Sequence, residues 1–435
     1  MKVWLLTIGE PVPVNEGSRD RLHRTGYLAH LLADYGHDVT WWTSTFDHFR
    51  KKHVFENDTT LHIGDNLEIR LLHGIGYQRN ISLARLIDHW QIAKKFTSCA
   101  RQERKTPDVI LSAFPTIELS TEAVRYGRER LVPVVLDMRD MWPDIFADHV
   151  PYILRPIINL LLYPLFLTSR HVCSEATSIT GHTDAFVEWG LRRGKRSRSY
   201  MDRAFPMGYI SAPPESVNIQ EAELFWDEMG ILAKGNDFIV CFIGSIGHQL
   251  DLDSVIFAAR MLRKQNRKAR FIICGDGDML SYYREMTADD PNILFPGWID
   301  KNQIFVLMRR SFIGIDPLPD RYDFLSTINN KAIEYMSAGL PVISTPNKGV
   351  LHDFLSLHQC GMSCPTGQPD KLALSLSYLL DNKEELKRMS ENALNVYKDY
   401  FIAEKVYVDM MNYLQDIVSR YQSASRDSML EKEMS

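Results

Sequence analysis

Short apolar runs alternate with helix-like segments along this chain, and this alternation constrains the fold more than any other feature. Residues 3–8 form the first apolar run, as expected for a strand that is buried on both faces. A loop rich in glycine and proline and a helix-like segment at 19–35 separate it from the next run, residues 39–43. A strand, a helix and a second strand in this order form a βαβ unit, which predicts a parallel sheet.

The alternation occurs twice, which predicts two domains. A chain of 435 residues is too long for one ordinary core, because domains usually hold about 100–200 residues. The segment 205–220 holds three prolines and two serines and is interpreted as a linker. The predicted parts are an N-terminal Rossmann-like domain (1–205), the linker (206–220), a C-terminal Rossmann-like domain (221–400), a helix that packs back on the N-terminal domain (401–422) and a tail (423–435).

The expected elements follow from the apolar periodicity. We expect strands at 67–72, 109–112, 132–137, near Ser178, and then at 238–243, 269–274, 293–295, 312–315 and 341–344. We expect helices near 82–104 and 117–129 and from Thr183, and then near 252–265, 276–287, 301–310, 328–338, 369–382 and 403–421.

The composition excludes several classes of function. A formal net charge of −5 argues against a nucleic-acid partner, because proteins that bind duplex DNA need a basic surface to displace counterions. No second cysteine pair or histidine cluster joins Cys360 and Cys364, so no metal site is predicted. The N-terminal apolar run is too short for a signal peptide, and no stretch reaches about 18 uninterrupted apolar residues. We therefore expect a cytoplasmic protein.

The segment 323–344 holds the highest density of candidate functional groups. Ser326 or Thr327 can cap a helix that Gly339 ends. Lys331 lies near its first turn, and Glu334 follows on the same face. Because the helix dipole disfavours a cation there unless an anion joins it, Lys331 and the free N–H groups are predicted to hold a phosphate, and Glu334 to accept hydrogen bonds from a ribose. The alternative is a surface Lys–Glu pair on an amphipathic helix.

The string NKAIEYMSAGLPVI, which begins at Asn330, resembles the donor-site signature of glycosyltransferase family 4. The resemblance extends from Met1 to about residue 415. It implies an α/β protein of the GT-B fold, with two Rossmann-like doubly wound domains facing across a cleft. It also implies that Glu334 contacts the donor ribose and that Lys331 lies near the diphosphate.

One position departs from the family pattern. Many members carry a second glutamate eight positions before the first, where this chain has Ser326. In this respect the chain resembles an Asn-Lys branch that builds bacterial surface polysaccharides such as O-antigen and capsule. Asp323, Ser326 and Thr327 are the nearby polar candidates for contacting the transferred sugar.

Two further segments of the second half are candidates for donor binding. Gly244, Ser245 and Gly247 follow a predicted strand, and glycines let backbone approach a phosphate closely. In the resembled family this loop meets the donor diphosphate, often with a basic pair where this chain has Ser245 and Leu250. Trp298 follows another strand, in a stretch that lies along the base in the resembled family; the alternative is a core tryptophan after a turn. The string CGDGD at 274–278 is interpreted as a turn and helix cap.

Cations gather at the N-terminus of the first predicted helix. Gly17, Ser18, Arg19 and Arg21 lie where the loop meets that helix, and its dipole disfavours cations. One interpretation is a bound anion, either the donor phosphate or a phosphate on the acceptor. The other is neutralisation by the acidic residues of the same segment.

A charged cluster follows the strand at 132–137. Asp140 is predicted to orient the acceptor hydroxyl, and Arg139 to neutralise the departing phosphate. The resembled family commonly has a His-Asp dipeptide at this place. The alternative is a structural cluster of salt bridges.

The resemblance implies an enzyme, a retaining glycosyltransferase that requires no metal and no cofactor beyond its nucleotide-sugar substrate, with UDP as the expected nucleotide. The transferred sugar is expected to be an N-acetylated amino or deoxy sugar and the acceptor lipid-linked or a saccharide. Residues 151–167 are apolar, and 192–198 hold five cations in seven positions. Both features suggest docking on an anionic membrane surface, at the periphery of the inner face of the cell membrane. Core packing of the apolar helix and a solvated basic loop are the alternatives.

Two other functions remain open at this point. A UDP-sugar epimerase of the same architecture would share the donor site and need no acceptor. A non-catalytic partner subunit would keep the fold without the reaction.

Overall fold

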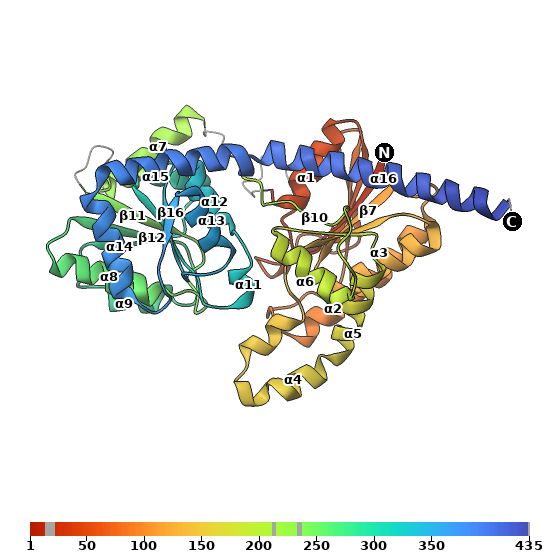
Figure 1. Ribbon diagram of the computed structural model, residues 1–435, viewed down its shortest axis with the longest axis horizontal. Coiled ribbons are helices and arrows are strands. Elements are labelled where there is room, and N and C mark those ends of the chain that lie inside the picture. The colour runs from red at the N-terminus through yellow and green to blue at the C-terminus, as the bar shows by residue number, and fades with distance from the viewer. Residues whose placement is uncertain (14–21, 211–214, 233–236, 434–435) are drawn as a thin grey trace. The chain divides into compact units, whose positions relative to one another are not determined.

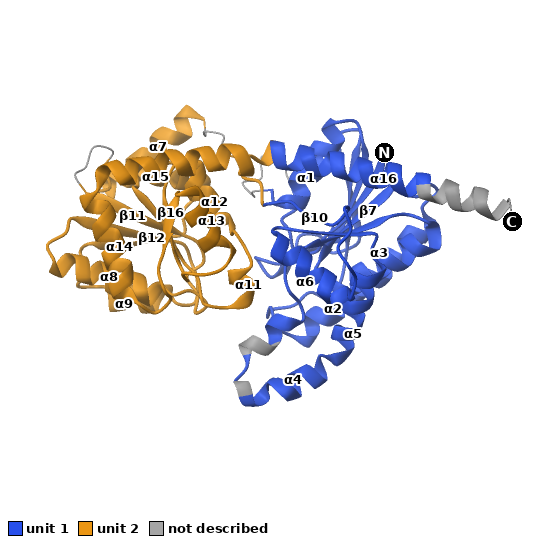
Figure 2. Cartoon of the chain, viewed as in Figure 1, with its two compact units in different colours: residues 1–206, 405–435 blue, residues 207–404 orange. Residues whose placement is uncertain are grey.

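The computed structural model describes residues 1–13, 22–210, 215–232 and 237–433. The chain divides into two compact units (Figures 1 and 2). Unit 1 comprises Met1–Pro206 and Lys405–Ser435, and unit 2 comprises Met207–Glu404. Each unit is a layered α/β structure with its own sheet.

Unit 1 is built on an eight-stranded sheet in the order β10-β9-β8-β7-β1-β2-β6-β5. The edge strand β5 pairs antiparallel with β6. All other neighbouring strands of this sheet, β1 and β2 included, pair in parallel. The bounds are β1 Lys2–Leu6, β2 Asp38–Ser44, β5 Thr59–Ile63, β6 Leu67–Leu72, β7 Val109–Phe114, β8 Val134–Met138, β9 Ser178–Gly181 and β10 Arg203–Ala204, with a separate two-stranded ribbon of β3 Phe46–Asp47 and β4 Lys52–His53.

Helices cover both faces of this sheet. The core on one face joins Trp4 of β1 to side chains of α2, α3, α5 and α6, including Phe96 and Val172. On the opposite face α1 approaches Trp41 through Gly26, where an added Cβ would lie 3.5 Å from the ring. The bounds are α1 Arg24–Asp34, α2 Leu83–Gln102, α3 Ile117–Arg130, η1 Asp144–His149, η2 Tyr152–Leu154, α4 Arg155–Leu161, α5 Tyr163–Glu175, α6 Asp184–Gly194 and α16 Ala403–Glu433.

Unit 2 has a six-stranded parallel sheet in the order β13-β12-β11-β14-β15-β16. This is the doubly wound Rossmann order, which reverses direction between β11 and β14. The strands are β11 Phe238–Ile243, β12 Ala269–Cys274, β13 Ile293–Gly297, β14 Ile313–Pro317, β15 Val342–Thr345 and β16 Gly361–Ser363. The helices are α7 Ser216–Glu228, α8 Leu252–Lys264, α9 Leu280–Met286, α10 Lys301–Arg310, α11 Tyr322–Leu325, α12 Asn330–Ser337, α13 Val350–His358, α14 Pro369–Asp381 and α15 Lys383–Val396, followed by the π-helical turn η3 Tyr397–Phe401.

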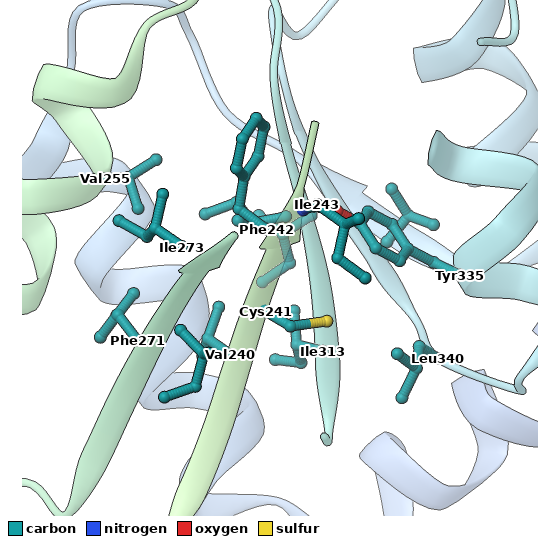
Figure 3. Close-up of a cluster of buried hydrophobic side chains, with 14 of the residues drawn as sticks. Val240, Cys241, Phe242, Ile243, Val255, Phe271, Ile273, Ile313, Tyr335 and Leu340 are labelled. Atoms are coloured by element: carbon teal, nitrogen blue, oxygen red, sulfur yellow. Dashed lines mark hydrogen bonds between the residues drawn. The ribbon is translucent and has the colours of Figure 1, made fainter. Parts of the chain in front are cut away.

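The buried Tyr335 fixes α12 against this sheet (Figure 3). Its ring lies over Gly314 of β14, where an added Cβ would come within 2.2 Å of the ring. Its hydroxyl accepts a hydrogen bond of 2.9 Å from the backbone N–H of Ile243. A helix held by both central strands has little freedom to shift, so the side chains that α12 presents are held in place as well.

Several predicted boundaries are wrong. The first helix begins at Arg24 rather than at residue 19, because the carboxylate of Glu10 accepts hydrogen bonds from Thr25 N (2.9 Å) and thereby caps the helix at that point. Helix α7 begins at Ser216, inside the predicted linker. Only Ala222 and Trp226 of this helix are buried, so its apolar periodicity is weak. Helix α16 continues to Glu433, past the predicted start of the tail at residue 423. The edge strand β5 was missed because only Leu61 and Ile63 of its five residues are apolar, so it contains no apolar run.

Candidate active site

Helix α12 of unit 2 begins one turn later than its predicted caps. Asn329 is the N-cap, and its side chain accepts a hydrogen bond of 3.1 Å from Ala332 N. Ser326 is buried, and its hydroxyl donates to the carbonyl of Tyr322 at 2.7 Å. The prediction that Ser326 or Thr327 caps the helix is therefore wrong, because Ser326 closes the preceding short helix α11 instead.

Lys331 lies at the point where the strand order of unit 2 reverses. Its ammonium group is 3.7 Å from Oδ1 of Asp316, a fully buried carboxylate at the end of β14. Its stem lies beside the loop that follows β11, since a Cβ added to Gly244 would be 3.1 Å from Cδ of Lys331. Ligands of open α/β sheets bind at this reversal, beyond the carboxyl ends of the strands.

Asp316 is a functional candidate that sequence reasoning missed. One oxygen accepts a hydrogen bond from the side-chain amide of Asn329, and the other has no hydrogen-bond partner in the described part of the chain. Burial raises the pKa of the Asp316 carboxyl, although Lys331 and Asn329 favour its charged form and oppose that shift. A single acid at the end of an apolar strand is the signal that could have revealed it.

Glu334 lies one turn further along α12. Its side chain is buried and accepts a hydrogen bond of 2.7 Å from the hydroxyl of Tyr209. The carbonyl of Tyr209 in turn accepts bonds from Ala403 N (3.1 Å) and from the hydroxyl of Tyr397 (2.9 Å). Glu334 is thus held in a hydrogen-bonded setting, and the alternative of a plain surface Lys–Glu pair is wrong.

The predicted phosphate loop, residues 244–247, packs against the glycine loop that follows β12. Gly275 and Gly277 have positive φ angles (139° and 157°), and added Cβ atoms would lie 1.8 Å from the carbonyl oxygen of Gly244 and 2.2 Å from that of Ile246. Only glycine permits this approach. Gly244 and Gly247 are half-exposed and Ser245 is exposed, so the loop has one face open to solvent.

The remaining residues that were predicted to bind the donor differ in exposure and in their hydrogen-bond partners. Trp298 is 72% exposed, so the alternative of a core tryptophan is wrong. Asp323 accepts two hydrogen bonds of 2.7 Å from the guanidinium of Arg321. Thr327 is half-exposed, and Asn330 is exposed at the first position of α12.

In unit 1, Arg139 belongs to a buried ion-pair network. Its guanidinium donates to Asp137 at 2.8 Å, to the hydroxyl of Thr25 at 2.9 Å and to the carboxylate of Glu10. Arg24 donates to both oxygens of the same aspartate, at 2.9 and 3.1 Å. Burial alone would raise the pKa of Asp137, but Arg24 and Arg139 hold it well below its ordinary value. This geometry favours the structural alternative for Arg139.

The same network reaches the end of the first segment of unit 1. Arg24 donates to the carbonyls of Phe205 (3.0 Å) and Pro206 (2.9 Å). Its guanidinium also lies 5.9 Å from the ring centroid of Tyr407 in α16. Nearby, burial and the charge of Arg24 lower the pKa of His182 to about 3, so this imidazole is neutral at pH 7. Sequence reasoning missed Glu10, Asp137 and His182 as members of one cluster.

Asp140 follows the network but is engaged locally. Its carboxylate accepts hydrogen bonds from Met141 N (2.8 Å) and from the indole nitrogen of Trp142 (3.2 Å). The residues predicted to bind an anion, Gly17, Ser18, Arg19 and Arg21, lie outside the described residues. Within the described ranges, no group of three or more His, Cys, Asp or Glu side chains is arranged to hold a metal ion.

Comparison with known proteins identifies the architecture. The family model for Glycosyl transferases group 1 matches residues 226–396. Sucrose-phosphate synthase from Thermosynechococcus elongatus superposes with a TM-score of 0.71 at 14% identity, over 96% of this chain and 99% of that one. The catalytic domain of starch synthase IV from Arabidopsis thaliana gives a TM-score of 0.65 at 11% identity, over 96% and 99% of the two chains. The fold is GT-B.

Two further relatives are similar to this GT-B chain. The HepE protein of Anabaena, solved in complex with UDP-glucose, has a TM-score of 0.60 at 14% identity, over 97% of this chain and 100% of that one. The alpha-D-kanosaminyltransferase of Streptomyces kanamyceticus is 23% identical over 277 residues, which are 57% of this chain and 68% of that protein. The family match contains Gly244, Asp316, Lys331 and Glu334, whereas Arg139 lies outside it.

Proposed function

We propose that this GT-B protein is a glycosyltransferase that takes its sugar from a nucleotide-diphosphate donor bound at α12. The observation that carries the proposal is the placement of Lys331 and Glu334. Both lie one turn apart on a helix at the reversal of the unit 2 sheet, inside the segment that matches Glycosyl transferases group 1. Lys331 and the N-terminal N–H groups of α12 supply positive charge for a diphosphate, and Glu334 supplies acceptors for ribose hydroxyls.

The proposed donor is a UDP-sugar. The Anabaena protein that shares this fold was solved with UDP, with UDP and glucose, and with UDP-glucose, which supports a uridine nucleotide. The name of the Streptomyces relative, a kanosaminyltransferase, supports an amino sugar as the transferred group. The exposed Trp298 is proposed to lie along the base, and Gly244, Ser245 and Gly247 to line the diphosphate.

The proposed reaction retains the anomeric configuration, as in glycosyltransferase family 4. The bond between the anomeric carbon and the diphosphate oxygen breaks, the acceptor oxygen bonds to that carbon, and the acceptor proton passes to the departing diphosphate. Lys331 stabilises the charge that develops on the leaving group. Asp140 is proposed to orient the acceptor hydroxyl, while the bonds of Arg139 to Asp137 and Thr25 favour a positioning role for that residue.

Nothing in this proposal requires a metal or a cofactor beyond the nucleotide sugar. Because Ser326 is buried where many family members have a glutamate, Asp323, Thr327 and Asn330 are the proposed contacts to the sugar. The proposed acceptor is lipid-linked or a saccharide of a bacterial surface polysaccharide such as O-antigen or capsule. The proposed location is the cytoplasm, at the inner face of the cell membrane.

Calorimetric titration with UDP, GDP and dTDP tests the donor site directly. We expect one diphosphate to bind preferentially to the wild type and both Lys331→Ala and Glu334→Ala to weaken it. Lys371→Ala and Glu384→Ala, on the exposed faces of α14 and α15, are matched controls that should bind like the wild type. If no diphosphate binds, or if the controls and the site variants behave alike, the assignment of α12 is wrong.

Because Ser326 takes the place of a glutamate found in many family members, two other functions also need a test. An epimerase of the same architecture would convert its UDP-sugar without an acceptor, and a non-catalytic subunit would form no product at all. Product formation that depends on an added acceptor supports the transferase over both.

A further inference from the structure

A helical hairpin of unit 1 exposes an unusual amount of apolar surface. In Figure 1 the helices α4 and α5 extend away from the sheet of unit 1. Each of the seven residues of α4 is partly or fully exposed. We call residues 151–175 the apolar hairpin. Its exposed large hydrophobic side chains are Ile153, Leu154, Ile157, Leu160, Leu161, Tyr163 and Leu167.

This exposure is large for each side chain. Ile153 is 82% exposed, Leu160 75% and Leu161 70%. A contiguous apolar patch of this kind marks a surface that another apolar phase covers, because leaving it in water is unfavourable. The predicted alternative, that residues 151–167 pack in a core, is wrong for these side chains.

A second apolar stripe lies on α2. Leu83, Ile87 and Trp90 follow one another at helical spacing and are all exposed. Arg85 of the same helix stacks over Trp142 at 4.4 Å, and Trp142 packs against Phe146 at 4.6 Å. Phe146 belongs to η1, which contacts α4. The aromatic cluster thus connects the buried side of α2 to the apolar hairpin, whereas the stripe lies on the opposite face of α2 from Arg85.

The charge of the hairpin points to the chemistry of its partner. The hairpin contains Arg155, Arg170 and His171, and its one acidic residue, Glu175 at its last position, pairs with Arg128 of α3 at 3.6 Å. An apolar surface with this charge complements a layer of acyl chains under anionic headgroups. A second copy of the chain would bring the same positive charges together across a two-fold axis, which disfavours self-association.

The basic run 192–198, which the sequence suggested as a headgroup contact, is largely paired within unit 1. Arg196 pairs with Asp202 at 2.6 Å, and Arg193 and Arg198 pair with Asp144 and Asp184. Three of its five cations therefore face carboxylates of unit 1. The attraction to anionic lipid must come mainly from the hairpin and its flanks, including the exposed Arg170.

We propose that the apolar hairpin inserts into one leaflet of an anionic bilayer, at the depth of the interface. Helices α4 and α5 have 7 and 13 residues, whereas about 20 are needed to cross the hydrocarbon core. None of the described helices is long and apolar enough to span a membrane. The inference deepens the proposed function, since a lipid-linked acceptor would be met at this surface, but the docking itself does not depend on catalysis.

Flotation with lipid vesicles tests the proposal on the full chain. We expect the wild type to float with vesicles that contain about 30% phosphatidylglycerol and only weakly with pure phosphatidylcholine. Because α4 is exposed, Leu160→Ser with Leu161→Ser should keep the fold yet lower the partition coefficient about 100-fold, roughly tenfold for each leucine. Leu357→Ser with Leu374→Ser, two exposed leucines of unit 2, is the matched control and should float like the wild type.

Charge and self-association supply the remaining outcomes. Arg170→Glu should reduce flotation severalfold with the anionic vesicles and leave the weak binding to phosphatidylcholine little changed. Equal flotation of the hairpin variant and the wild type overturns the proposal, as does an absence of flotation. If the protein instead forms a dimer in sedimentation, loses it on the two serine substitutions and does not float, the surface is assigned to a second copy of the chain.

Titration with UDP separates this inference from the proposed function. The hairpin variant should bind UDP like the wild type. A chain that floats but binds no nucleotide supports membrane docking and contradicts the proposed function.

Discussion

Each unit has a charged cluster near the carboxyl end of a buried strand, but the two clusters pair their cations differently. In unit 1, Arg24 and Arg139 share the buried Asp137 and direct their other N–H groups to carbonyl, hydroxyl and carboxylate oxygens. In unit 2, Lys331 has one ion pair at 3.7 Å, with Asp316, and its side chain remains 22% exposed. This difference favours a structural role for the first cluster and supports the proposal that the second contacts a ligand.

This difference is useful because the sequence presents the two clusters alike. Both appear in it as a cation and a carboxylate close together, Arg139 and Asp140 after a buried strand and Lys331 and Glu334 on one helix. What separates them is the number of hydrogen bonds that the cation already makes, since a guanidinium with most of its donors occupied has few left for a phosphate. Changing one residue in each cluster should therefore give opposite patterns of stability and binding.

Asp137→Ala should have the largest effect, because it leaves Arg24 and Arg139 buried without their shared carboxylate. Removing one partner of a buried ion pair costs about 3–5 kcal/mol, so we expect a loss of that size in the free energy of unfolding, measured by chemical denaturation. Asp184→Ala removes an exposed partner of Arg198 and should change the stability by less than about 1 kcal/mol. If the two variants lose similar stability, the unit 1 cluster is not a structural support.

Lys331→Ala should produce the converse pattern. The loss of a charge-assisted contact to a diphosphate is expected to weaken nucleotide binding about 10–100-fold, measured by calorimetry. Its effect on thermal stability should be much smaller than that of Asp137→Ala, because Lys331 is partly exposed and makes one long ion pair. Arg139→Ala sharpens the contrast, since it should reduce stability and leave nucleotide affinity nearly unchanged. Equal weakening of binding by both variants would contradict the comparison.

Much of the fold could be predicted from the sequence because buried parallel strands are continuous apolar runs. The strand at 67–72 coincides with β6, and Lys331 and Glu334 were found because both lie on one short helix. The partners of these residues were not found. Tyr209 lies 125 residues before Glu334, in a segment expected to be a linker, and Glu10 lies 129 residues before Arg139. Pairings over such distances are set by the strand order, which local periodicity does not reveal.

Tyr209→Phe tests one of these missed partners. The change removes the hydrogen bond to Glu334 and keeps the ring, so the carboxylate loses one of the donors that orient it toward a ribose. We expect nucleotide affinity to fall about fivefold, equivalent to about 1 kcal/mol, with a much smaller change in binding of a diphosphate that lacks the ribose, such as pyrophosphate. Tyr378→Phe, on the exposed face of α14, is the control and should change neither affinity. Equal losses for nucleotide and pyrophosphate would show that Tyr209 acts on the whole unit rather than through Glu334.

The smallest expected effect lies in the pH dependence of stability, where the two buried aspartates should have opposite signs. The pKa of Asp137 is lowered in the folded state, so its contribution is fully present above the unfolded value of about 3.9 and is lost as the pH falls through the folded pKa. The pKa of Asp316 is raised, so the folded state binds a proton more tightly than the unfolded state and stability falls as the pH rises from about 3.9 through the folded pKa.

Denaturation curves between pH 3 and pH 7 therefore distinguish the clusters without any ligand. The destabilisation caused by Asp137→Asn should shrink as the pH is lowered toward 3. Asp316→Asn should become more stable relative to the wild type as the pH rises, because the wild type must then hold a charged carboxylate in a buried position with a single hydrogen bond. Slopes of the same sign for the two variants would mean that Lys331 neutralises Asp316 as completely as the arginines neutralise Asp137, which would contradict the comparison of the two clusters.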